Sequence, residues 1–196
     1  MKRTLITATV LLAASVGAFA QTAAASTVQR DVNQQTRIEQ GLQNGSITSR
    51  EGALLERDQT KVDRLQAQAL KDGKMSDAER ARLSAAQNKA SRDINTAEHN
   101  GVNGNPQSAS SQRMQADVQR NINQEKRVEG GIQNGSLTNH EVSKLERGQA
   151  KVDHKEFVAG RDGKVSAKEQ ARVQHAENHQ SHRIHREKTD ANVRKG

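Results

Sequence analysis

The sequence contains no cysteine, tryptophan or tyrosine, and its 196 residues include only two phenylalanines and one proline. The absence of cysteine excludes disulfide bonds, thiolate metal ligands and cysteine nucleophiles. The scarcity of aromatic rings removes the platforms on which nucleic-acid bases stack, so we expect no nucleic-acid partner. Only 32% of the residues are hydrophobic and the mean hydropathy is −0.96, which together predict a thin, aliphatic core.

Catalytic motifs are also missing. The sequence holds no GxSxG turn, no phosphate-binding P-loop and no HExxH pair. Its acidic residues follow the spacing of i,i+4 partners of Lys and Arg on solvated helix faces, and we expect no group of them in an apolar pocket. The sequence therefore predicts a protein that is not an enzyme and carries no organic cofactor.

The N-terminus has the pattern of a secretory signal peptide. Lys2 and Arg3 precede an apolar run over residues 5–16, and Ala-Phe-Ala at 18–20 forms a small-x-small cleavage site. The run is shorter than the roughly 18 residues that a membrane span needs, and no second run follows it. We expect cleavage after residue 20, no transmembrane segment in the mature chain, and a periplasmic or secreted location. Loss of the two basic residues lowers the formal net charge from +8 to +6.

The chain is an internal duplication with a period of 90 residues and no gap. For example, LER at 55–57 returns at 145–147, and DGK at 72–74 returns at 162–164. Between the copies, a stretch rich in Gly, Asn and Ser holds the only proline, which is typical of a flexible linker. The predicted organisation is a signal peptide (1–20), a first repeat (21–98), a linker (99–113), a second repeat (114–190) and a basic tail (191–196).

An octet of the form Asn/Asp-Gly-polar-aliphatic-Ser/Thr-x-x-Glu occurs four times, beginning at Asn44, Asp72, Asn134 and Asp162. Its Gly suits a turn with positive φ, and its Ser/Thr and Glu form a capping box that begins a helix. Between the octets, apolar residues recur at spacings of three and four, which predicts helices over 27–43, 48–71 and 76–98 in the first repeat. The expected fold is all-α, with two tandem three-helix up-down-up units joined by the flexible linker.

The same octet resembles half of an EF-hand calcium loop. On that alignment, Glu51, Glu79, Glu141 and Glu169 occupy the bidentate position that closes the loop. The early ligand positions hold no carboxylates, however, and a hard cation needs six to eight oxygens. Capping therefore explains these glutamates better than calcium binding does.

The last predicted helix carries four histidines, His175, His179, His182 and His185, at i, i+4, i+7 and i+10. Imidazole nitrogens four residues apart on a helix can chelate Zn²⁺, Cu²⁺ or Ni²⁺. Folding of the last hairpin brings His140 level with the last of them, so these five histidines are the candidate metal ligands. The stripe lies opposite the apolar seam of its helix, which predicts an exposed and weakly selective site.

The duplication also supports an alternative for these histidines. The first-repeat positions equivalent to His140, His179 and His182 hold Arg50, Lys89 and Arg92. The histidines are then members of a solvated, partly titrating basic face. Residues 183–195 extend this basic character and suggest binding of anionic envelope polymers such as lipopolysaccharide or peptidoglycan, with a frayed, solvated terminus as the alternative.

The segments QGLQNGSIT, LERDQTKVD, DGKMSDAERAR and QNKASRDI resemble a group of small exported proteobacterial proteins built from this unit. The resemblance runs through both repeats and implies an exported helical-repeat protein, and it supplies no catalytic or ligand residue. We expect a non-enzymatic periplasmic binding or stress-related accessory protein. The rival hypotheses are sequestration of Cu, Ni or Zn ions by the histidines and binding of anionic envelope polymers.

Overall fold

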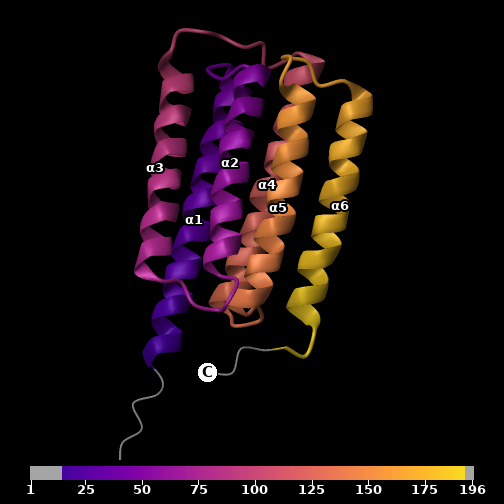
Figure 1. Cartoon of the computed structure of the whole chain (residues 1–196). Coiled ribbons are helices and arrows are strands. Elements are labelled where there is room, and N and C mark those ends of the chain that lie inside the picture. The colour runs from indigo at the N-terminus through magenta and orange to yellow at the C-terminus, as the bar shows by residue number, and fades with distance from the viewer. Residues whose placement is uncertain (1–14, 193–196) are drawn as a thin grey trace, which may run out of the picture.

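The computed structural model describes the backbone of residues 15–192 and the side chains of residues 23–192. These residues form six α-helices and no strand, which confirms the all-α prediction. The helices are α1 (Ser15–Asn44), α2 (Ser49–Ala69), α3 (Asp77–His99), α4 (Ala109–Gln133), α5 (Asn139–Gly160) and α6 (Ala167–Thr189). Consecutive helices run in opposite directions (Figure 1).

Most of the predicted signal peptide, residues 1–14, lies outside the described residues, and residues 15–20 form the first turns of α1. Within residues 15–192, none of the helices combines the length and the apolar character that a membrane crossing requires.

The four octets form the helix-to-helix turns that the sequence predicts. Each has its Gly in the left-handed region, with φ between 77° and 87°. In the first octet the Thr48 hydroxyl accepts a hydrogen bond from the Glu51 amide, and the Glu51 carboxylate accepts one from the Thr48 amide at 2.9 Å. The same reciprocal capping box begins α3, α5 and α6. Each closing glutamate is thus engaged in ending a turn, as the capping interpretation requires.

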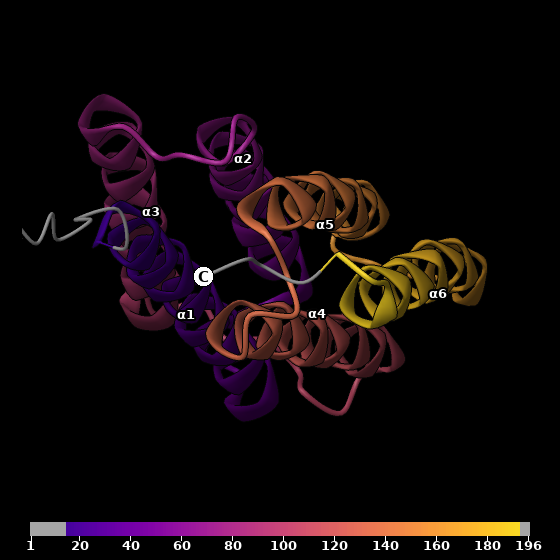
Figure 2. The ribbon, with the colours of Figure 1, turned by 90° about the horizontal axis from the view of Figure 1, so that it is seen from below.

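The two repeats are packed into one bundle. The most extensive helix contacts join α2 to α5 and α1 to α4, and both pairs join the first repeat to the second. Seen from the end, these four helices form the centre, while α3 lies outside α1 and α2, and α6 lies outside α4 and α5 (Figure 2). Each three-helix repeat therefore shares its core with the other repeat.

The connection between the repeats is hydrogen-bonded to the first turn. The Gly104 amide donates to the Gly45 carbonyl at 2.8 Å, and the Asn100 side chain donates to Glu51 Oε1 at 2.6 Å. Residues 109–113, which the sequence assigns to the linker, belong to α4 because Ser108 caps that helix. The segment outside helices is accordingly shorter than predicted.

The interior is divided into two apolar ends and a polar middle. The buried polar residues are concentrated in the middle turns of the four central helices, where they alternate with some members of the two apolar clusters. One apolar cluster includes Val28, Val62, Leu70, Leu83, Val128, Ile132, Val142, Leu145 and Ile184, and the other includes Val32, Ile38, Leu42, Leu55, Ile94, Met114, Val118, Ile122 and Val173. The polar layer between them contains Asp31, Gln35, Glu56, Gln59, Asp63, Gln66, Asn121, Glu125, Glu146, Gln149, Asp153 and Glu156.

Candidate metal centre

The polar layer and its borders bury an unusual number of carboxyl groups. Nine acidic residues are 3% exposed or less: Asp31, Glu56, Asp63, Asp117, Glu125, Glu146, Asp153, Glu156 and Glu177. Within the described residues only Glu177 among them forms an ion pair, with Arg120 at 2.9 Å. An unpaired buried charge is expensive, so these groups must be protonated or must share a cation. The expectation that the acidic residues lie on solvated helix faces was wrong for these nine.

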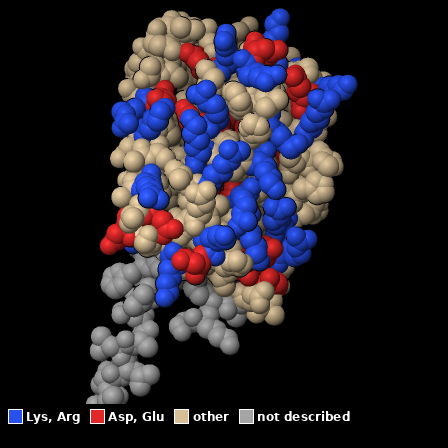
Figure 3. All heavy atoms as spheres, viewed as in Figure 1, with Lys and Arg blue, Asp and Glu red and all other residues tan. Residues whose placement is uncertain are grey.

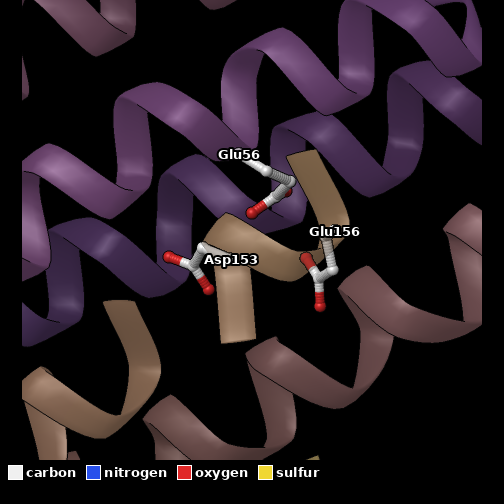
Figure 4. Close-up of side chains that lie close together, drawn as sticks. All are labelled: Glu56, Asp153 and Glu156. Carbon is white, nitrogen blue, oxygen red and sulfur yellow. The ribbon is translucent and has the colours of Figure 1, made fainter. Parts of the chain in front are cut away.

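Glu56, Asp153 and Glu156 form the first carboxylate cluster. One oxygen of each lies within 4.8 Å of one oxygen of each of the others. Glu56 extends from α2, and the two other side chains extend from the facing surface of α5 (Figure 4). Two amides complete the surroundings: Gln35 on α1 donates to Glu56 Oε2 at 2.9 Å, and Asn121 on α4 donates to Glu156 Oε2 at 2.8 Å. All four central helices thus contribute to the site.

The second carboxylate cluster consists of Asp63, Glu125 and Glu146, and one oxygen of each again lies within 4.8 Å of one oxygen of each of the others. Gln66 on α2 approaches Glu146 and supplies a nearby amide. Glu146 is fully buried, and neither of its carboxyl oxygens has a hydrogen bond within the described chain. Gln66 is fully buried too, and neither its amide oxygen nor its nitrogen is satisfied. Buried polar groups nearly always find a partner, and a cation bound between Glu146 and Gln66 would satisfy their oxygens.

The 90-residue repeat relates the two clusters. Glu56 of the first is equivalent to Glu146 of the second, and Asp153 of the first is equivalent to Asp63. At the two remaining positions, Glu in one cluster corresponds to Gln in the other: Glu156 is equivalent to Gln66, and Glu125 is equivalent to Gln35. Both clusters therefore contain two Glu, one Asp and one Gln, although the third carboxylate comes from a different helix in each. Four donors are thus matched between the clusters, while Asn121 beside the first cluster is equivalent to Asp31 beside the second.

The two clusters are in contact through their aspartates. The Asp63 and Asp153 carboxyl groups interact directly, and such a contact favours a proton between the two groups or a cation beside them. Glu56 and Glu156 interact in the same way within the first cluster. The second oxygens of Asp63 and Asp153 remain unpartnered. The ionisation of one cluster is accordingly coupled to that of the other.

Burial sets the protonation of these groups. It raises the pKa of Asp153 to about 7 and the pKa of Asp31, beside the second cluster, to about 8. Burial first, and then repulsion from neighbouring carboxylates, raises the pKa of Glu56, Glu125, Glu146 and Glu156 well above its ordinary value. Without a cation, burial therefore favours the protonated form of these carboxyl groups.

The donor set fits a hard divalent cation. Three carboxylates can offer up to six oxygens, and a Gln amide oxygen can add another, which approaches the six to eight oxygens of a calcium site. Oxygen ligands without imidazole or thiolate favour Ca²⁺, Mn²⁺ or Mg²⁺ over Cu²⁺ and Zn²⁺. Mg²⁺ is the poorest match of the three, because it retains several waters and the clusters are enclosed.

The histidines predicted as ligands lie elsewhere. His175, His179, His182 and His185 are exposed on α6, and only the first two have rings in contact, with centroids 4.5 Å apart. His140 is exposed at the start of α5, where its Nδ1 lies 3.1 Å from the Lys71 carbonyl oxygen. Within the described residues, no group of three potential ligands that lie within 4.8 Å of one another includes a histidine.

A third acidic group is less suited to a cation. It consists of Glu141, Glu187 and Asp190, near the end of α6. The Glu141 carboxylate already accepts the Thr138 amide at 2.8 Å in the capping box of α5. This group is therefore explained in part by helix capping.

A sequence signal for the carboxylate clusters existed and was missed. Glu56, Gln59, Asp63 and Gln66 are spaced by three, four and three residues, and the same spacing recurs from Glu146 to Glu156. This is the spacing of a buried seam between helices, in polar residues instead of apolar ones.

Searches of known protein families, curated proteins and solved structures found no match to this chain.

Proposed function

We propose that this chain is an exported, non-enzymatic helical protein that binds hard divalent cations, Ca²⁺ or Mn²⁺, in the two carboxylate clusters between its repeats. The observation that carries the proposal is the matched donor set of the clusters, with two Glu, one Asp and one Gln in each, fully enclosed in the polar layer. A bundle that needed only stability would gain from apolar residues at these positions, since buried ionisable groups seldom add to stability.

Binding in these clusters exchanges protons for a cation. Because burial favours the protonated form of the carboxyl groups, a divalent ion must displace protons from each cluster that it enters. Affinity should then rise with pH, and about two protons should be released for each ion bound. The coupling through Asp63 and Asp153 makes the two binding events dependent on each other.

The enclosure of the clusters favours a binding role over a catalytic one. Glu56, Asp153 and Glu156 are each 1% exposed or less, so an organic substrate has no path to them in this conformation. A bare ion can enter when the bundle opens locally, and its exchange should then be slow. We therefore propose an ion-binding protein without a chemical reaction.

Calorimetric titration of the mature, EDTA-treated protein with Ca²⁺ and Mn²⁺ tests this function. The expected result is about two ions per chain, with a heat that depends on the buffer because protons are released. Glu56→Gln/Glu156→Gln and Glu125→Gln/Glu146→Gln are matched variants, since each removes two carboxylates from one cluster and keeps the Asp63–Asp153 contact. Each should bind one ion instead of two.

Two controls separate this site from other carboxylates and from the histidines. Glu98→Gln removes a carboxylate that pairs with Arg37 on the outside of the bundle, and it should leave the titration unchanged. His175→Ala/His179→Ala/His182→Ala should also leave it unchanged. If only Cu²⁺, Ni²⁺ or Zn²⁺ binds, and the histidine variant abolishes binding, the carboxylate proposal is wrong and sequestration by the histidines replaces it.

A further inference from the structure

Three hollows lie in a row along the outer face of α5. One hollow, between α2 and α5, contains Arg64, Lys71 and Arg147, and a second, between α5 and α6, contains Arg147, Lys151 and Arg183. A third hollow continues between α5 and α6 and shares Lys151 and Arg183 with the second. Because neighbouring hollows share lining residues, they are adjacent, and we call the row of three the basic groove. Its cationic residues are Arg64, Lys71, Lys144, Arg147, Lys151, Lys155 and Arg183.

The charge of the basic groove is almost unopposed. Its lining includes one carboxylate, Glu187, which lies 4.0 Å from Lys144. Among the described residues, none of the other six cations forms an ion pair. Lys and Arg side chains form a band along this face of the molecule (Figure 3). His175 and His179 line one end of the groove and add charge when they are protonated.

The first repeat provides an internal comparison, because its equivalent surface is not basic. There the hollow between α2 and α3 contains Asp58 and Asp93, which pair with Lys89, and Asp58 also pairs with Lys61 at 3.0 Å. The second repeat has Gly148 and Arg183 at the positions equivalent to the two aspartates.

Two half-buried leucines of the first repeat are also replaced by cations in the second. Leu54 is equivalent to Lys144, and Leu65 is equivalent to Lys155. The one change in the opposite direction is at Ala97, whose equivalent is the carboxylate Glu187. The basic character of the hollows between α5 and α6 is thus specific to the second copy and does not follow from the repeat itself.

The chemistry of the groove selects one class of partner. Its lining contains no Phe, Tyr or Trp on which a base could stack, which disfavours single-stranded nucleic acid. The only exposed large hydrophobic residues of the described chain are Val102 and Val158, too few to enter a lipid bilayer. We propose that the basic groove binds an extended anionic polysaccharide, whose carboxylate or phosphate groups pair with Arg147, Lys151 and Arg183. This proposal is independent of the carboxylate clusters.

Titration of two fluorescently labelled glycans with the protein, followed by anisotropy, tests the groove. Polygalacturonate supplies carboxylates, and the delipidated core of lipopolysaccharide supplies phosphates. The probe that binds more tightly therefore identifies the anionic group that the groove prefers. Arg147→Gln/Lys151→Gln should weaken binding by about three- to thirtyfold, the effect of losing two exposed ion pairs. The dependence of affinity on salt should become shallower as well.

The matched control is Arg57→Gln/Lys61→Gln, which makes the same change at the equivalent positions of the first repeat. It should alter affinity less than twofold, while the charge-preserving Arg147→Lys/Lys151→Arg should retain most of the binding. Equal losses of affinity in the two Gln variants would show that only the net charge of the protein matters, and would overturn the proposal. Tighter binding of double-stranded DNA than of either glycan, at the same salt concentration, would overturn the partner class. Circular dichroism confirms that each variant is folded.

Discussion

In the absence of divalent cations, the free energy of unfolding of this protein should fall as the pH rises from about 4 to about 8. Burial raises the folded-state pKa of Asp31 to about 8 and of Asp153 to about 7, from an ordinary value of 3.8. The folded state then binds these protons more tightly than the unfolded state does. Their contribution is fully present below about pH 4 and is lost as the pH approaches the folded-state values.

The size of this effect is large for a single domain. A shift of one pKa unit corresponds to about 1.4 kcal/mol, so Asp31 accounts for roughly 6 kcal/mol and Asp153 for roughly 4 kcal/mol over their full ranges. Water entry around the ionised groups will lower both values. Even half of this total is comparable to the stability of a typical domain, so the cation-free protein should be close to unfolding at about pH 8.

Urea unfolding of the EDTA-treated mature protein, followed by far-UV circular dichroism at several pH values, measures this dependence. Asp153→Asn removes one titrating group and should flatten the profile by about 1.4 kcal/mol per pH unit between about pH 4 and 7. Asp93→Asn, at a partly exposed site that pairs with Lys89, should leave the profile unchanged.

Saturating Mn²⁺ or Ca²⁺ should restore stability at about pH 8, by about 2.7 kcal/mol at a hundred times the dissociation constant of one site. Stability that increases from about pH 5 to about pH 8 without cations would show that the buried carboxyls are ionised in the fold, and would refute the reasoning.

Three further predictions concern the bundle itself. Gly130→Ala should stabilise α4 by about 0.5–1 kcal/mol, because the added methyl group meets nothing within 4 Å. Gly131→Ala should destabilise the bundle by about 1–3 kcal/mol, because its Cβ would lie 2.5 Å from Leu137 Cδ1. The urea unfolding midpoints of the two variants measure the difference. Thr48→Ala should cost about 1 kcal/mol through loss of the capping box, and an unchanged thermal midpoint would contradict that role. The first repeat alone should be unfolded or dimeric in analytical ultracentrifugation, because its main contacts are with the second repeat, and a cooperatively folded monomer would contradict this packing.

Much of the fold follows from local patterns in the sequence. The octets predict the turns because the Gly and the capping-box pair act within a few residues of one another, as Thr48 and Glu51 do. Apolar spacing likewise predicts the helices, although α4 begins at Ala109, inside the predicted linker.

The pairing of the repeats could not be predicted in the same way. Nothing local indicates that α2 packs on α5, and the carboxylate clusters exist only because of that contact. The candidate site was therefore placed on the histidines of α6, whose helical spacing is visible in the sequence. The polar seam from Glu56 to Gln66 was equally regular, yet its residue types resembled a solvated face.

The polar layer also has a consequence for the alignment of the helices along their axes. Aliphatic side chains such as Val62 and Val152 can pack against one another in several alignments, so apolar ends alone would tolerate sliding. A slip of α2 along α5 by one turn, about 5.4 Å, would carry Glu56 away from Gln35 and towards aliphatic neighbours. The carboxyl group would lose its amide partner without reaching water, so the polar layer fixes the register of the bundle as well as the position of its candidate ligands.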